Sequence, residues 1–167
     1  TYPRELTDVP SKSQFGDRLV TQYRESIYVG YRYYDKAQKA VLFPFGHGLS
    51  YTSFEYSDLR LSSNAVNDES WVEVTLKVKN VGPFDGKEVV QLYVSSPSSK
   101  LFKPEKEMKD FCKIFLKRGE EQEVSFRLGK RAFAYWNVNI HDWHVETGMY
   151  RLLVGSSSRD IRCEAIV

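Results

Sequence analysis

The chain has 167 residues, with 24 Lys plus Arg against 22 Asp plus Glu. A length of this order predicts one domain with enough chain to bury a core. The near-neutral charge excludes a typical nucleic-acid binder, which would be clearly basic. The sequence has no apolar run of about 18 residues, so it predicts no membrane-spanning helix. The unusual feature is an aromatic content of 14%, from 3 Trp, 11 Tyr and 10 Phe.

The first 53 residues have no regular hydrophobic period and are interrupted by Pro3, Pro10 and Pro44. A thin apolar stripe allows a helix over residues 17–26. A segment this rich in rings cannot form a core by itself, so the rings need a partner surface. The aromatic side chains in question are Tyr28, Tyr31, Tyr33, Tyr34, Phe43, Phe45 and Tyr51.

From residue 54 onward the apolar residues alternate with polar ones. The clearest run is 72–78, where Val72, Val74, Leu76 and Val78 alternate with charged residues and Thr, as in a half-buried antiparallel strand. About seven or eight such strands follow one another, separated by turns rich in Gly, Pro, Asn and Asp. The pattern predicts a mainly β fold over residues 54–167, an antiparallel sandwich of immunoglobulin or fibronectin III type.

No catalytic constellation emerges from residue spacing. Gly46 and Gly48 lack the third glycine of a dinucleotide fingerprint, and Ser50 lacks the following glycine of a nucleophile elbow. His141 and His144 would face opposite sides of a strand, which suits a surface hairpin better than a metal site. No pair of carboxylates has a setting that favours glycosidase chemistry.

Two tryptophans and two cysteines have alternative interpretations. Trp136 and Trp143 could stack on a sugar ring, although a tryptophan in a sandwich is more often part of the core. Cys112 and Cys163 lie in apolar strand patterns and are expected to be buried free thiols, with a bridge left open if their strands are neighbours.

The sequence indicates a cellular compartment only through the features that it lacks. No charged-then-apolar leader marks a signal peptide, and no Asn begins an Asn-x-Ser/Thr sequon. These features favour an intracellular chain over a secreted one, and a leader upstream of Thr1 would reverse that preference.

Several runs of residues resemble the C-terminal part of glycoside hydrolase family 3 β-glucosidases. The similarity covers essentially the whole chain, in order and with matching spacing, which makes it more specific than any one motif. The longest matching runs are Val29-Gly-Tyr-Arg-Tyr-Tyr-Asp35, Leu42-Phe-Pro-Phe-Gly-His-Gly-Leu-Ser-Tyr-Thr52, Asp85-Gly-Lys-Glu-Val-Val-Gln-Leu-Tyr-Val94 and Val154-Gly-Ser-Ser-Ser-Arg-Asp160.

The resemblance implies a division of the chain and an activity for its parent. Residues 1–53 would end an α/β sandwich domain and link it to a fibronectin III-like domain, residues 54–167. The family's aspartate nucleophile and acid/base glutamate would lie upstream, in a barrel domain and the α/β sandwich domain, so no catalytic residue is assigned here. The parent would hydrolyse terminal β-linked glucose with retention and would need no metal or organic cofactor.

The remaining expectations concern partners. The upstream domains would be the partners of this chain and would bind the β-glucoside, whereas self-association stays open. The alternatives are a free-standing carbohydrate-binding or adhesion module and, within the family, a β-xylosidase or arabinosidase. Both the ring-rich composition and the resemblance predict an interdomain contact made by Tyr31, Arg32, Tyr33, Asp35, Phe43 and Phe45.

Overall fold

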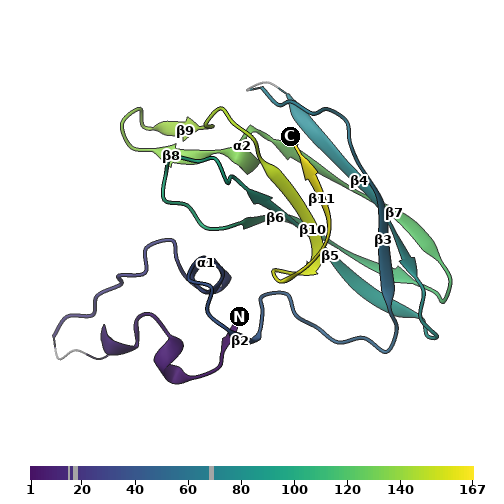
Figure 1. Ribbon diagram of the computed structural model, residues 1–167, viewed down its shortest axis with the longest axis horizontal. Helices are drawn as coiled ribbons and strands as arrows, with labels where there is room; N and C mark the ends of the chain where they lie inside the picture. Colours follow the sequence, from purple (N-terminus) through teal and green to yellow (C-terminus); the bar gives the residue numbers. More distant parts are fainter. Residues whose placement is uncertain (15, 17–18, 68–69) are drawn as a thin grey trace.

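The computed structural model describes residues 1–14, 16, 19–67 and 70–167 (Figure 1). Residues 1–53, called here the N-terminal segment, are mostly irregular, and residues 19–26 form no helix. The expected helix over 17–26 is therefore wrong for residues 19–26, while 17 and 18 lie outside the described residues. The elements of the segment are β1 (Tyr2–Pro3), two short 3₁₀ turns (Leu6–Asp8 and Lys12–Gln14), α1 (Tyr31–Lys36) and β2 (Val41–Phe43).

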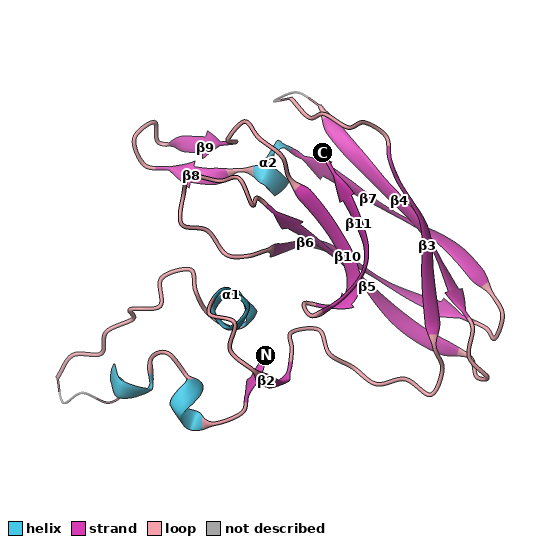
Figure 2. Cartoon of the chain, in the orientation of Figure 1, coloured by secondary structure: helices cyan, strands magenta, loops and turns pink. Residues whose placement is uncertain are grey.

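The rest of the chain forms two antiparallel sheets that pack face to face, as the alternating pattern predicted (Figure 2). The three-stranded sheet has the order β3-β4-β7, and the four-stranded sheet has the order β11-β10-β5-β6. The strands are β3 (Phe54–Leu61), β4 (Trp71–Asn80), β5 (Gly86–Ser95), β6 (Glu107–Leu116), β7 (Glu121–Gly129), β10 (Arg151–Ser157) and β11 (Asp160–Ile166).

The core lies between the two sheets and is built from alternate residues of each strand. On β4, Val72, Val74 and Leu76 are 0% exposed. They pair with Leu128, Phe126 and Val124 of β7, so that apolar side chains meet on one face. Each fully buried side chain of this kind contributes about 1.5–3 kcal/mol. The facing sheet supplies Val90, Leu92, Val94, Ile114, Leu116, Leu152 and Val154.

The outer faces of the two sheets differ in character. The outer face of the three-stranded sheet carries polar side chains such as Glu73, Thr75 and Lys77. On the four-stranded sheet, Gln91 and Tyr93 alternate with core residues and so point outward, yet they are buried. They are buried because α1 and the chain that follows it pack over this face of the sheet.

A small hairpin lies outside both sheets (Figure 2). The turn α2 (Lys130–Phe133) leads the chain out of β7, after which β8 (Tyr135–Asn137) and β9 (Asp142–His144) pair with each other. Trp136 is 47% exposed as a result. The expectation that Trp136 and Trp143 belong to the sandwich core is therefore wrong, and the surface hairpin expected around His141 and His144 is confirmed.

Cys112 and Cys163 are free and half-buried. They lie on β6 and β11, the two edge strands of the four-stranded sheet, with β5 and β10 between them. A bridge between them would need neighbouring strands, so the expectation of free thiols is confirmed, whereas their expected burial is only partial.

Candidate domain-docking site

Tyr31, at the start of α1, packs its ring against the sandwich. The ring stacks on Phe45 at 4.8 Å and meets Tyr93 edge-on at 6.0 Å between centroids. The Tyr31 hydroxyl accepts a hydrogen bond of 2.9 Å from the backbone N–H of Met108 on β6. One side chain thus satisfies a backbone donor of the sheet and contributes ring contacts on both sides.

Asp35, near the end of α1, lies between two basic side chains of the sandwich region. Its Oδ1 accepts a hydrogen bond from Arg159 Nε at 2.9 Å, and its Oδ2 lies 2.9 Å from Lys106 Nζ. The Asp35 side chain is 6% exposed. Arg159 also donates to the carbonyl oxygens of Tyr34 and Lys39, so it closes the C-terminal end of α1.

Arg32 forms a looser contact with β6. Its Nη2 lies 3.2 Å from Glu107 Oε1, and Glu107 also pairs with Lys109 at 3.1 Å. About a third of each of the Arg32 and Glu107 side chains is exposed. A pair exposed to this extent contributes at most about 1 kcal/mol, so Arg32 adds little to the stability of the contact.

Tyr33 and Phe43, which were expected at the same contact, have partners within the N-terminal segment. Tyr33 meets Tyr34 edge-on at 5.1 Å. Phe43 stacks on His47 at 5.3 Å, and it meets Tyr2 edge-on at 6.3 Å across the β1–β2 pair. The structure therefore brings Tyr31, Arg32, Asp35 and Phe45 against the sandwich, and it places Tyr33 and Phe43 beside other residues of the segment.

Gln91 is the docking residue that residue patterns missed. Its Nε2 donates to the carbonyl oxygen of Ser156 at 2.6 Å and lies 3.5 Å from that of Gly46, while its Oε1 accepts from the Tyr93 hydroxyl at 2.5 Å. A Cβ on Gly46 would overlap the side-chain amide of Gln91, so glycine allows this approach without moving Gln91. Gln91 alternates with the core residues of β5, and the covering segment buries it on the outer face of the sheet.

The phenol of Tyr93 is neutral at pH 7, as tyrosines ordinarily are, and its surroundings move its ionisation to still higher pH. Desolvation raises the pKa of Tyr93, and the nearby Tyr31 and Asp35 raise it further. A neutral hydroxyl can donate to Gln91. The Tyr93 side chain therefore contributes both ring packing and a hydrogen bond to Gln91, and the contact contains no buried phenolate charge.

The linker from the N-terminal segment to β3 is fixed at both ends. At one end the carbonyl oxygen of Phe45 accepts from the N–H of Ser158 at 2.9 Å. At the other, Thr52 Oγ1 donates at 2.5 Å to Asn80 Oδ1, and Asn80 donates to the carbonyl oxygens of Phe84 and Leu116. Between these points, Leu49 and Tyr51 are each 93% exposed.

The geometry supports adhesion between two parts of the chain. Its elements are stacked rings, an ion pair nearly closed to water, and a glycine that allows close backbone approach. Within the described ranges, no group of three or more His, Cys, Asp or Glu side chains is placed to hold a metal ion. No helix in the part of the chain that the structure covers is long and apolar enough to cross a membrane.

Comparison with known proteins places these features in a family. Residues 88–158 match the fibronectin type III-like domain. The chain is 54% identical over 162 residues to thermostable β-glucosidase B of Acetivibrio thermocellus, covering 96% of this chain and 22% of that protein. It is 42% identical over 162 residues to an exo-α-(1→6)-L-arabinopyranosidase of Bifidobacterium breve, covering 96% and 21%.

Solved structures agree with this result. A GH3 β-glucosidase of Bifidobacterium adolescentis superposes with a TM-score of 0.92 at 43% identity, over 100% of this chain and 24% of that one. The chain thus spans about a fifth to a quarter of the length of the relatives it matches. It corresponds to the C-terminal segment of glycoside hydrolase family 3 β-glucosidases, which contains their fibronectin type III-like domain.

Proposed function

We propose that this chain is the non-catalytic C-terminal part of a retaining β-glucosidase. In this proposal residues 1–53 end the upstream α/β sandwich domain, and residues 54–167 form the scaffold domain onto which that end is clamped. The observation that carries the proposal is the buried Asp35 carboxylate, which pairs with both Lys106 and Arg159. A contact this closed to water holds the segment in one orientation on the sandwich.

The exposed side chains of the N-terminal segment support an upstream partner. Leu19, Tyr23, Leu49 and Tyr51 are all at least 88% exposed. Large apolar side chains this exposed are suited to contact with a partner surface. In the proposal, the upstream domains of the same protein cover these side chains, whereas a free-standing module would leave them in water.

The catalytic part of the proposal is tested with the chain and its parent together. The 167-residue chain should not hydrolyse an aryl β-D-glucoside, and the full-length parent should hydrolyse it with retention at the anomeric carbon. Hydrolysis by the chain alone, or a parent without glycosidase activity, would overturn the proposed function.

A pentoside substrate is the second candidate, because one relative is named an arabinopyranosidase. Since the sugar-binding residues lie upstream in this proposal, only the parent can discriminate the two. Comparison of kcat/KM for aryl β-D-glucoside, β-D-xyloside and α-L-arabinopyranoside decides between them. A preference for the glucoside supports the first candidate.

The clamp is tested by a substitution in the parent. Asp35→Asn should lower its thermal unfolding temperature and leave KM for the aryl glucoside near the unsubstituted value. A variant that kept its thermal stability but lost turnover would contradict the clamp, because the residue would then act on the chemical step.

A further inference from the structure

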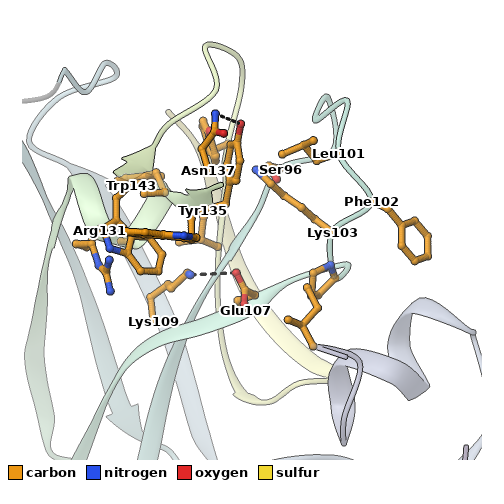
Figure 3. A pocket seen from close by; sticks show the side chains of 18 of the residues that line it. Ser96, Leu101, Phe102, Lys103, Glu107, Lys109, Arg131, Tyr135, Asn137 and Trp143 are labelled. Atoms are coloured by element: carbon orange, nitrogen blue, oxygen red, sulfur yellow. Dashed lines mark hydrogen bonds and ion pairs between the residues drawn. The ribbon is translucent and has the colours of Figure 1, made fainter. Parts of the chain in front are cut away.

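A groove of about 780 Å³ lies between the β8–β9 hairpin and the connection that leads from β5 into β6 (Figure 3). Sites for small molecules generally have volumes of about 300–1,000 Å³ and are lined by aromatic groups with a few polar ones. Figure 3 shows Arg131 and Trp143 on one side of the groove and Lys103 and Leu101 across from them. The groove shares Glu107 and Lys109 with the docking site described above, and the other residues that line it take no part in that site.

The aromatic wall of the groove is held in place before any ligand arrives. The rings of Trp136 and Trp143 meet at 5.5 Å with an interplanar angle of 65°. The Arg131 guanidinium lies 3.1 Å from the centre of the Trp143 ring, so one face of Trp143 is occupied. Trp136 is 47% exposed and remains the ring available for stacking.

Three of the charged side chains that line the groove, Lys103, Glu107 and Lys109, form ion pairs, and Arg131 lies over the Trp143 ring. Lys103 Nζ lies 2.8 Å from Glu146 Oε2, and Lys109 Nζ lies 3.1 Å from Glu107 Oε2. Burial raises the pKa of Glu146, but hydrogen bonds from Lys103 and Ser99 outweigh this and the pKa is lowered overall. Because both lysines are paired with carboxylates and Arg131 is held against Trp143, the walls suit a neutral polar ligand better than an anion.

We propose that this groove binds a neutral β-linked gluco-oligosaccharide at a site separate from catalysis. A pyranose ring has an apolar C–H face, which would lie on Trp136, and a rim of hydroxyl groups, which would bond to Asn137, Asn139 and the paired charged groups. The choice of a β-linked glucan rests on the proposed function. The groove itself rests only on the geometry of this chain.

The experiment is a titration of the 167-residue chain with cellotetraose, followed by tryptophan fluorescence and by backbone amide NMR shifts. Saturable changes should appear at residues of the hairpin and of the 96–106 connection. Trp136→Ala should weaken binding about tenfold, the 1.4 kcal/mol scale of one well-packed aromatic anchor. Trp136→Phe, which keeps a ring, should retain part of the affinity.

Trp71→Ala is the matched control. Trp71 is 43% exposed and has an arginine, Arg127, 3.5 Å from its ring centre, but it lies on β4 and does not line the groove. This substitution should leave the titration unchanged. Equal weakening by Trp71→Ala and Trp136→Ala, no saturable change at millimolar cellotetraose, or equal binding of α-linked maltotetraose would each overturn the inference.

The result is separable from the proposed function. A chain that binds cellotetraose while its parent fails to cleave β-glucosides would support the groove and overturn the proposed activity. Two results together would overturn saccharide binding by the groove. They are a chain that binds no saccharide, and a Trp136→Ala substitution that lowers the unfolding temperature of the parent but not of the 167-residue chain. The upstream domains would then cover the groove.

Discussion

Asp35 and Arg159 are 124 positions apart in the chain, yet Asp35 Oδ1 and Arg159 Nε are 2.9 Å apart. Arg159 lies in the turn between β10 and β11, and Asp35 lies on α1, which is the only α-helix of the N-terminal segment in the described ranges. Because Lys106 lies 2.9 Å from the other carboxylate oxygen, Asp35 joins three separate parts of the chain. The docking of residues 1–53 depends on this carboxylate more than on any other single polar group of α1.

Replacing Asp35 with Asn should destabilise the chain by about 3 kcal/mol. The substitution removes one partner of a buried ion pair, which leaves Lys106 and Arg159 without their counter-charge, and such changes typically cost about 3–5 kcal/mol. The free energy of unfolding in urea measures the effect. Asp58→Asn is the control, because Asp58 also pairs with two basic groups, Arg60 and Lys77, but is 48% exposed.

Asp58→Asn should cost less than about 1 kcal/mol, as expected for an exposed pair. Equal losses in the two variants would contradict the role given to Asp35. Limited proteolysis adds a second readout, because Asp35→Asn should increase cleavage within residues 19–30 before the sandwich itself is cut.

Gly46→Ala should weaken the docking of the N-terminal segment more than Gly119→Ala weakens the sandwich. Both glycines have a positive φ, 81° and 78°, so alanine is strained by a similar amount of about 1–2 kcal/mol at each. A Cβ at Gly119 meets nothing within 4 Å, whereas at Gly46 it would collide with Gln91. The difference in unfolding free energy between the two variants therefore measures the cost of the clash with Gln91 separately from the cost of backbone strain.

The difference is measured by urea unfolding and by NMR shifts of the Gln91 side-chain amide. Gly46→Ala should displace the Gln91 amide signals, and Gly119→Ala should leave them in place. Equal destabilisation with an unmoved Gln91 would show that only backbone strain matters at Gly46.

Alternation along the strands predicted the sandwich well. The run 72–78 is buried at every second residue, as expected from its sequence. Alternation separates the two faces of a strand but does not say what covers the outer one, so it could not indicate that Gln91 and Tyr93 are buried. The covering segment is more than 40 residues away in sequence and has no period of its own.

Local sequence patterns could not predict the partners of the contact residues either. Composition indicated that the rings near Tyr31 need a surface, and the structure supplies Tyr93. Nothing local to Asp35 indicates Arg159, because that pairing exists only once β10 and β11 are in place. Trp136 and Trp143 were misassigned for a related reason, since three alternating residues look alike in a core strand and in a surface hairpin.

Two free thiols should be counted in the unreduced chain under denaturing conditions. Cys112 and Cys163 lie on opposite edges of the four-stranded sheet, so an intramolecular bridge would require the sheet to come apart. A thiol-reactive chromophore gives the count. Cys163 should also react slowly in the folded chain, because burial raises the pKa of its thiol and lowers the thiolate fraction. Absence of free thiols in the denatured, unreduced chain would contradict the structure.

Glu88→Gln should stabilise the chain at pH 7 and have no such effect near pH 4. Glu88 accepts a hydrogen bond of 2.9 Å from the Tyr56 hydroxyl. Burial raises the pKa of Glu88 above its usual value of 4.5, and this outweighs the opposing effects of Tyr56 and Arg162. The folded state therefore binds the proton more tightly than the unfolded state, so stability linked to Glu88 is present below that value and is lost as pH rises through the folded-state pKa.

A glutamine at this position stays neutral and keeps an oxygen to accept the Tyr56 hydroxyl, so it avoids the cost of a buried carboxylate at pH 7. The measurement is the difference in thermal unfolding temperature between Glu88→Gln and the unsubstituted chain at the two pH values. Glu123→Gln, at an exposed position on β7, controls for the removal of one negative charge. A gain of the same size at both pH values would contradict the linkage, because a proton-independent packing effect would then account for it.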